Sequence, residues 1–279
     1  MRAAVLSGKG GTGKTFVAVN LAAAAGKSVY IDCDVEEPNG RVFFKPEGVN
    51  TETVYSLLPQ FDAQCCTGCR KCVDFCHFNA LAYIKNKPMI FQDVCHSCGG
   101  CLLVCPENAV SEIKRPVGIV EHGHSSGVQV VTGVLNVGEA SAVPVIKAAL
   151  EKGKELDDNT TVIDCPPGSS CSVMESVNEA DYCVLVVEST AFGFHNFRMV
   201  YELVRLLGKP CGVVLNKKDV PYEPLESFCR ENSLEILAEI PYSEKLAELA
   251  ANGKIAAEHD EQAREIFVQL LNRIGGELE

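Results

Sequence analysis

The sequence lacks a long apolar segment, an excess of basic residues and room for a leader. No apolar run reaches the roughly 18 residues that a membrane-spanning helix needs, so we expect no membrane span. The chain has 25 Lys and Arg against 37 Asp and Glu, a formal net charge of −12. Because broad nucleic-acid binding needs a basic face, we expect no nucleic-acid partner. A glycine-rich loop begins at Gly8, too early to follow a signal peptide, so we expect a cytoplasmic protein.

Cysteine, in contrast, is abundant, with 15 residues, and much of it is regularly spaced. Eight cysteines form two runs of the pattern C-x2-C-x2-C-x3-C: Cys66, Cys69, Cys72 and Cys76, then Cys95, Cys98, Cys101 and Cys105. In a cytoplasmic chain such runs are typical of metal-bound thiolates rather than disulfides. Zinc is the main alternative, but it needs neither the third cysteine of each run nor the x3-C ending. The spacing predicts two [4Fe–4S] clusters.

The two runs belong to an internal repeat, because each cysteine of the first run recurs 29 positions later. The segment 77–81 (HFNAL) also echoes 106–110 (PENAV). This repeat resembles the bacterial two-cluster ferredoxin, a small pseudo-symmetric fold. The resemblance implies that the fourth cysteine of each run ligates the other cluster. The first cluster would then be held by Cys66, Cys69, Cys72 and Cys105, and the second by Cys95, Cys98, Cys101 and Cys76.

The first run departs from the ferredoxin pattern at two points. Cys76 is followed by His77, whereas Cys105 is followed by Pro106. Cys65 lies next to Cys66 and could replace it, although the spacing favours Cys66. The local geometry after Cys76 could therefore differ from that of a ferredoxin.

The glycine-rich loop matches G-x4-G-K-[ST] and predicts a phosphate-binding site. Residues 2–6 read as a buried strand before the loop, and residues 14–25 as a helix after it. We expect Lys14 to neutralise the β- and γ-phosphates and the Thr15 hydroxyl to bind Mg²⁺. The ATP-binding residues predicted in the loop are Gly8, Lys9, Gly10, Gly11, Thr12, Gly13, Lys14 and Thr15.

A second lysine, Lys9, stands early in the loop, within the sequence KGGTGKT. This resembles the deviant Walker A motif of the MinD/ParA family, whose relatives include the nitrogenase iron protein and the Mrp-type cluster carriers. The resemblance implies that Lys9 reaches the nucleotide of a second subunit, in a homodimer or in a heterodimer with a paralogue. The alternative is a solvated loop lysine.

Two acids that follow predicted strands complete the nucleotide site by the same resemblance. Residues 28–31 read as a strand that leads to Asp32 and Asp34. Asp34 would position the attacking water, with Asp32 in support. Residues 161–163 read as a strand that leads to Asp164, which would hold Mg²⁺ through its water shell. The predicted catalytic residues are Lys9, Lys14, Asp34 and Asp164.

The resemblance also places Asn216 and Pro241 at the nucleobase. Asn216 follows a predicted strand over residues 211–215 and can offer both a donor and an acceptor to an adenine edge. Residues 216–219 (NKKD) also match the guanine signature of GTPases. The resemblance over the whole chain favours ATP.

We therefore predict a doubly wound, mostly parallel α/β sheet (P-loop NTPase) built from residues 1–60 and 113–279, with a small α+β ferredoxin lobe inserted over residues 61–112. Residues 113–140 would link the insert back to the second half. The expected function is a Mg²⁺-dependent ATPase, slow and partner-stimulated, that couples nucleotide state to electron transfer with a redox partner protein. Two alternatives stay open: a redox-sensing assembly or positioning ATPase of the cell-division type, and an iron–sulfur cluster carrier. Burial of the eight cysteines would oppose cluster transfer by a carrier.

Overall fold

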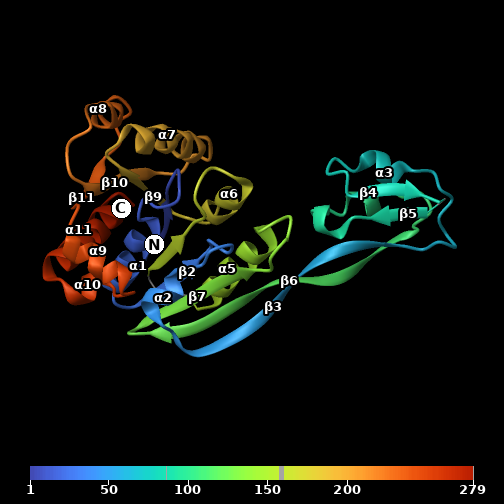
Figure 1. The fold of residues 1–279 in the computed structure, drawn as a ribbon, viewed down its shortest axis with the longest axis horizontal. Coiled ribbons are helices and arrows are strands. Elements are labelled where there is room, and N and C mark those ends of the chain that lie inside the picture. The colour runs from blue at the N-terminus through green and yellow to red at the C-terminus, as the bar shows by residue number, and fades with distance from the viewer. Residues whose placement is uncertain (86, 157–159, 279) are drawn as a thin grey trace.

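A computed structural model describes residues 1–85, 87–156 and 160–278 of the chain (Figure 1). Its strands are β1 (Arg2–Leu6), β2 (Ser28–Asp32), β3 (Glu47–Phe61), β4 (Leu81–Ile84), β5 (Lys87–Ile90), β6 (Val110–Ser125), β7 (Val128–Leu135), β8 (Thr161–Asp164), β9 (Tyr182–Glu188), β10 (Cys211–Lys218) and β11 (Ile236–Pro241). Its helices are α1 (Lys14–Ala24), α2 (Gly40–Phe44), α3 (Lys71–Phe75), the 3-10 turn η1 (Gln92–Val94), α4 (Gly100–Leu103), α5 (Val143–Glu155), α6 (Cys171–Val177), α7 (Ala191–Leu206), α8 (Glu223–Glu231), α9 (Glu244–Ala251), α10 (Ala256–His259) and α11 (Glu261–Gly276).

The body of the molecule is a nine-stranded sheet with helices on both faces. The strand order is β11-β10-β9-β1-β8-β2-β7-β6-β3, and all neighbouring pairs from β11 to β7 are parallel. Strand β6 is antiparallel to both β7 and β3. Parallel strands that are covered on both faces are continuously apolar, which is why the predicted strands were recognisable. The predicted fold class is confirmed.

The central strand β1 shows how the two cores form. Ala4 and Leu6 pack toward helices α5 to α8, whereas Ala3 and Val5 pack toward α1, α10 and α11. Successive side chains of a strand point to opposite faces, so one strand contributes to both cores. The last helix, α11, buries Phe267, Leu270 and Ile274 in the second core. No helix in the described part of the chain combines the length and apolarity needed to cross a bilayer.

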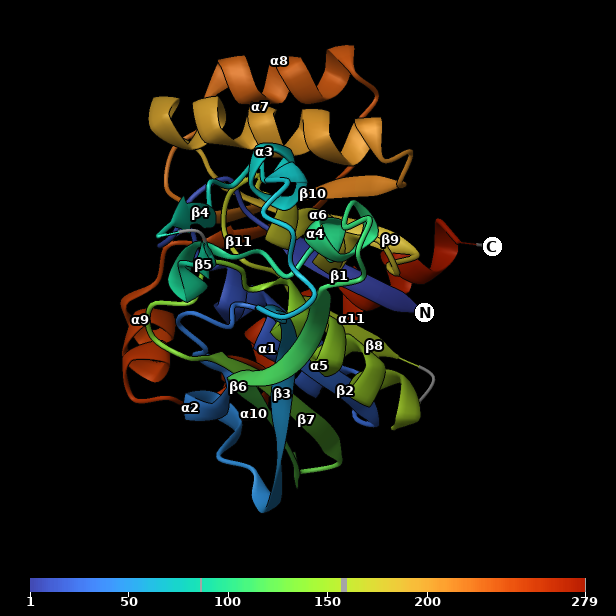
Figure 2. The same cartoon turned by 90° about the vertical axis from the view of Figure 1, so that its right-hand side faces the viewer.

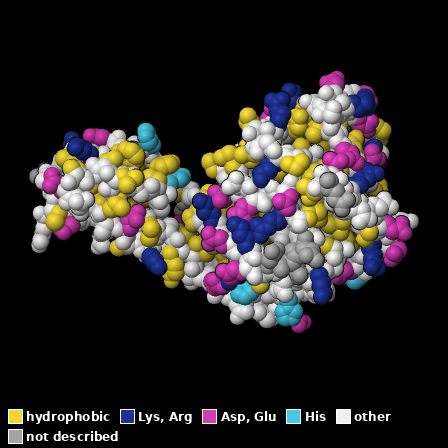
Figure 3. All heavy atoms as spheres, turned by 180° about the vertical axis from the view of Figure 1, so that it is seen from behind, with side chains coloured by type: hydrophobic (Ala, Val, Ile, Leu, Met, Phe, Trp, Pro, Cys, Tyr) yellow, Lys and Arg dark blue, Asp and Glu magenta, His cyan; other side chains and the backbone are white. Residues whose placement is uncertain are grey.

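A long antiparallel ribbon of β3 and β6 leaves the edge of the sheet and carries a separate lobe (Figure 1). The pairing runs from Glu47 opposite His124 to Phe61 opposite Val110. The register shifts between Val54 and Tyr55, which produces a bulge in the ribbon. Figure 2, viewed with the lobe toward the reader, shows the lobe in front of the body. Figure 3 shows a narrow connection between the two and hydrophobic side chains gathered on the lobe surface.

The lobe (residues 62–109) is built as two similar halves. Positive φ angles at Gly68, Arg70 and Asn79 recur 29 residues later, at Ser97, Gly99 and Asn108. Helix α3 begins at Lys71 and α4 begins 29 residues later, at Gly100. The sequence repeat is therefore also a repeat of backbone conformation.

The segment 113–140 is more than the link that the sequence predicts. Most of it forms residues 113–125 of β6 and the whole of β7, which are strands of the main sheet. Val120, Val130 and Val131 are buried in the two cores, which explains why these residues are ordered as sheet. The lobe is consequently joined to the body by the continuous strands β3 and β6.

Candidate nucleotide site and cysteine cavities

The loop after β1 and the segments after β2 and β8 surround a cavity of about 440 Å³. Gly13 has a φ of 87°, and a Cβ at this position would lie 2.1 Å from Asn216 Nδ2. Only glycine fits this position. The lining combines the predicted loop with acids and prolines from the two other segments: Ser7, Lys9, Gly10, Gly11, Thr12, Gly13, Lys14, Thr15, Asp34, Val35, Glu36, Glu37, Asn39, Ala142, Pro166, Pro167, Ser170 and Ser172.

Lys14 is buried and is paired with two acids. Its Nζ lies 2.6 Å from Asp164 Oδ1 and 3.5 Å from Asp34 Oδ2. Burial lowers the pKa of Lys14, but the charges of Asp164 and Asp34 together outweigh it, so the pKa lies above its ordinary value. Burial raises the pKa of Asp34, although the charge of Lys14 opposes this. The structure thus brings together three of the four predicted catalytic residues.

Two buried residues of β2 hold these acids in place. The Tyr30 hydroxyl donates a hydrogen bond to Asp164 Oδ2 at 2.9 Å. Asp32 accepts hydrogen bonds from the backbone N–H of Gly40 at 2.9 Å and of Asp34 at 3.2 Å. Burial and the charge of Asp164 raise the pKa of Asp32. Asp32 therefore fixes the segment between β2 and α2 that carries Asp34.

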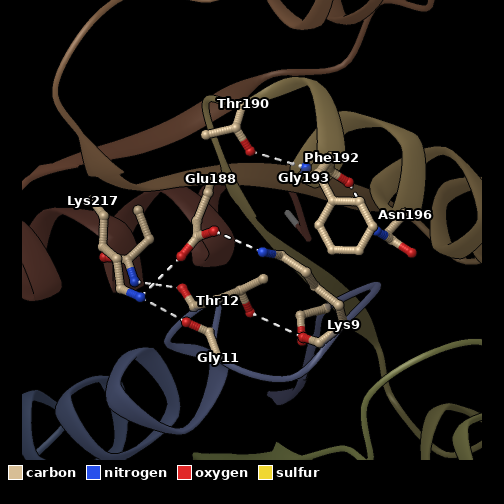
Figure 4. A network of polar contacts seen from close by, with 11 residues as sticks. Lys9, Gly11, Thr12, Glu188, Thr190, Phe192, Gly193, Asn196 and Lys217 are labelled. Carbon is tan, nitrogen blue, oxygen red and sulfur yellow. Dashed lines mark hydrogen bonds and ion pairs between the residues drawn. The ribbon is translucent and has the colours of Figure 1, made fainter.

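Lys9, the fourth predicted catalytic residue, is paired within its own chain (Figure 4). Its Nζ lies 3.0 Å from Glu188 Oε2 and 4.9 Å from the centre of the Phe192 ring. Lys217 Nζ donates to Glu188 Oε1 at 2.9 Å and to the Gly11 carbonyl at 2.6 Å. Burial raises the pKa of Glu188, but the two lysines lower it by more, so it lies below its ordinary value. Glu188 is the common partner of both lysines.

The predicted base-binding residues lie on the other side of Gly13. Asn216 is buried, and its Nδ2 donates to the Thr12 carbonyl at 2.7 Å. An adjacent pocket of about 180 Å³ is lined by Phe16, Pro241 and Tyr242 together with Asn216. In this arrangement the Asn216 donor fixes the glycine-rich loop.

The eight cysteines of the two runs line two cavities in the lobe. Four cysteines, three from the first run and one from the second, are among the residues that line the first: Cys66, Cys69, Cys72 and Cys105. The other four line the second: Cys76, Cys95, Cys98 and Cys101. In each cavity the fourth cysteine comes from the other run. Cys65 is exposed and stands outside both linings.

The cysteines are more exposed than the sequence led us to expect. None of the eight is buried, and Cys69 and Cys98 are exposed. The reason is the small core of a lobe of this size, in which Ala80, Leu81 and Ala109 are among the few buried apolar residues. Within the described ranges, no group of three His, Cys, Asp or Glu side chains is gathered closely enough to hold a single metal ion.

Comparison with known proteins places the body in a family. Residues 3–256 match the family described as CobQ/CobB/MinD/ParA nucleotide binding domain. The chain belongs to this family. It is thus a P-loop ATPase of the MinD/ParA type.

The MinD/ParA-type chain is similar to two curated relatives and to several solved structures over 84% or more of its length. Uncharacterized protein MJ0578 of Methanocaldococcus jannaschii is 27% identical over 98% of this chain and 96% of its own length, and MJ0579 of the same organism is 24% identical over 84% and 91%. The fold is similar to that of the Pyrococcus furiosus cell division ATPase MinD (20% identity, TM-score 0.59, covering 99% of this chain and 98% of that one). It is also similar to the septum site-determining protein MinD of Pyrococcus horikoshii OT3, solved with Mg-ADP (19% identity, TM-score 0.60, covering 98% and 95%).

Sequence reasoning missed three residues of the MinD/ParA-type site. Tyr30 lies two positions before Asp32 in β2, so the two side chains point to the same face of the sheet. The alternation of side chains along a strand could have indicated this from the sequence. Glu188 is the last residue of β9, a strand whose carboxyl end faces the loop. Lys217 was read only as part of a possible guanine signature, whereas its contacts are to Glu188 and the loop.

Proposed function

We propose that the chain binds Mg²⁺–ATP in the 440 Å³ cavity and hydrolyses it. The observation that carries this proposal is the convergence of Lys14, Asp34 and Asp164 at one point beside the phosphate loop. Lys14 already lies in an anionic site, so binding a triphosphate exchanges acid partners for phosphate oxygens. Thr15 and Asp164 offer the hydroxyl and carboxylate oxygens that Mg²⁺ prefers. Bound Mg²⁺ would neutralise charge on the phosphates.

Different residues of this chain would hold the phosphates, orient the water and add positive charge. The backbone N–H groups of the loop and Lys14 hold the phosphates. Asp34, the more exposed of the acids at Lys14, faces the cavity and is placed to orient a water molecule toward the phosphate. Lys9 would add positive charge to the nucleotide of a second subunit, as the family resemblance implies. The partner subunit is either a second copy or a paralogue. Two relatives of this chain occur in one archaeon, which supports a paralogous pair.

We further propose that the two cysteine cavities hold [4Fe–4S] clusters. The fit rests on each cavity being lined by four cysteines, three from one run and one from the other. Zinc gathers its thiolates about 2.3 Å from one atom, whereas a cube spreads them over its corners. The Ala109 N–H donates to Cys105 Sγ at 3.3 Å, a type of contact that favours a thiolate ligand. Bound clusters would supply one-electron transfer.

Together these sites support a nucleotide-dependent switch that is coupled to electron transfer with a redox partner protein. The supporting observation is the β3–β6 ribbon, which is continuous with the sheet that carries the nucleotide site. Strand β7 pairs with β2, the strand that leads to Asp34, and also with β6 of the ribbon. A change at the carboxyl end of β2 therefore has a short structural route to the lobe.

The test is anaerobic purification followed by two measurements on the same sample. We expect about eight irons per chain and Mg²⁺-dependent ATP hydrolysis, with hydrolysis lost in Lys14→Ala but iron retained. The cluster potentials should change when ATP is added to the wild type and stay constant in Lys14→Ala. Full iron without any effect of ATP on the potentials would contradict the coupling. ATP hydrolysis without iron would contradict the clusters.

The resemblance to cell-division ATPases supports a second candidate function, that of a positioning ATPase. The MinD structures share the fold of this chain over nearly its whole length. A redox-sensing positioning ATPase would bind its partner in an ATP-dependent manner even when the cysteines are replaced by serine. A cluster carrier is a third possibility, which the exposure of Cys69 and Cys98 favours. Transfer of iron from the lobe to an apo-ferredoxin would distinguish it.

A further inference from the structure

Arg115 stands where the ribbon joins the lobe to the body. It belongs to β6 and pairs across the ribbon with Ser56. Its guanidinium Nη2 donates to Glu139 Oε2, and its Nη1 lies 3.6 Å from Asp93 Oδ1. The Arg115 and Glu139 side chains are 22% and 10% exposed, whereas Asp93 is 87% exposed. The strong partner of Arg115 is therefore Glu139 of the body, and the contact with Asp93 of the lobe is weak.

On the lobe side, Arg115 lies near the second cysteine cavity. Asp93 lies in η1, two residues before Cys95. The wall of the same cavity includes Pro59 and Glu112, a cross-strand pair of the ribbon close to Arg115. The positive charge thus lies near one of the two cavities.

On the body side, Glu139 belongs to the segment 136–142 between β7 and α5, which ends at the nucleotide cavity. Ala142, its last residue, lines that cavity. Asn136, its first residue, donates its backbone N–H to the Val117 carbonyl at 2.9 Å, at the bulge of the ribbon. One short segment therefore contacts the nucleotide cavity, the ribbon and Arg115.

Arg115 also has an unpaired donor. Its Nε is buried without a hydrogen-bond partner in the described part of the structure. Native proteins rarely leave such a donor unpaired, and each exception calls for an explanation, such as a redox role or a bound water or ion. Reducing a cluster adds a negative charge, which a nearby cation stabilises in a site of low dielectric constant. Glu139 partly cancels that cation.

We propose that Arg115 and Glu139 form an electrostatic element that sets the reduction potential of the cluster held by Cys76, Cys95, Cys98 and Cys101, and through which the nucleotide cavity acts on that cluster. The proposal rests on the proposed function, because it needs the clusters and the nucleotide. Arg115 raises the potential, and Glu139 moderates this effect. A nucleotide that moves segment 136–142 changes how closely Glu139 holds the guanidinium. Arg115 is thus a positioning and tuning residue rather than a catalytic one.

The test is a redox titration of the anaerobic protein followed by electron paramagnetic resonance. Arg115→Gln should lower one of the two cluster potentials, and Glu139→Gln should raise the same one. Arg115→Lys, which keeps the charge, should stay near the wild type. Arg70→Gln is the matched control, because Arg70 lines the first cavity, and it should leave this potential unchanged. Loss of packing alone would not move the potential in opposite directions in the two Gln variants.

Adding a non-hydrolysable ATP analogue tests the second half of the proposal. The wild type should show a shift of the same cluster potential, and both Gln variants should lose that shift. Unchanged potentials in both variants, or shifts in the same direction, would overturn the inference. A protein without iron would instead defeat the proposed function. Should Arg115→Gln fail to fold, Glu139→Gln and Arg115→Lys still test the direction and the charge dependence.

Discussion

The Lys9 ammonium lies 3.0 Å from the Glu188 carboxylate of its own chain and is therefore not free at the surface. Glu188 also holds Lys217, which in turn is bonded to the Gly11 carbonyl. The family resemblance assigns Lys9 to a second subunit's nucleotide. If Lys9 does so, its pairing with Glu188 has to be broken before a dimer closes, and Glu188 would then oppose dimer formation.

Replacing Glu188 with Gln should therefore promote ATP-dependent dimerisation. A partly exposed ion pair is worth about 0–1 kcal/mol, so the ATP concentration at half dimerisation should fall by about two- to fivefold. Sedimentation velocity with a non-hydrolysable analogue would measure this. Glu239→Gln is the control, since Glu239 pairs with the neighbouring Lys218 instead. Unaltered or weaker dimerisation in Glu188→Gln would show that the pairing is no restraint.

Replacing Tyr30 with Phe should destabilise the protein by about 1–3 kcal/mol, because it leaves a buried carboxylate oxygen of Asp164 without its donor. Urea unfolding of the nucleotide-free protein would measure the change. Tyr182→Phe is a matched control, since Tyr182 is equally buried but its hydroxyl has no partner among the described residues. Tyr182→Phe should be neutral or stabilising. Equal losses in the two variants would mean that ring packing, and not the hydrogen bond to Asp164, matters at position 30.

The sequence was sufficient to predict the elements whose signals are local. The strand before Gly8, the helix from Lys14 and the sheet class follow from apolar runs and a glycine-rich loop, and the structure contains them. The ribbon was not predicted, because β3 carries polar residues over its first half and lacks the apolar run of a buried strand. The contacts of Glu188 and Arg115 were not predictable either, since their partners lie 179 and 24 residues away.

Asp32 gives the nucleotide-free protein a specific pH dependence. Its folded-state pKa is raised above the ordinary value of 3.8 by burial and by the charge of Asp164. An acid of this kind releases its proton more readily in the unfolded chain, so its contribution to stability falls as the pH rises above about 4. Asp32→Asn removes this titration. The stability of the variant relative to the wild type should therefore increase with pH, by at most about 1.4 kcal/mol per pH unit.

Urea unfolding of both proteins between pH 5 and 8, without nucleotide or Mg²⁺, would measure the difference. Asp34→Asn is a useful comparison, because Asp34 is more exposed and also pairs with Lys14, so its slope should be smaller. A stability difference between wild type and Asp32→Asn that stays constant over this range would show that Asp32 is ionised in the folded protein throughout.

The crossed cysteine cavities predict a particular pattern of double substitutions. Cys105 lines the cavity of the first run, so Cys105→Ser combined with Cys66→Ser should remove one cluster and leave about four irons per chain. Cys105→Ser combined with Cys98→Ser should affect both cavities and leave almost none. Cys65→Ser, outside both linings, should keep about eight. Iron and sulfide analysis of anaerobic protein gives the counts. The reverse pattern, with Cys105 and Cys98 removing a single cluster, would mean that each run holds its own cluster and that the two halves of the lobe are not joined through their ligands.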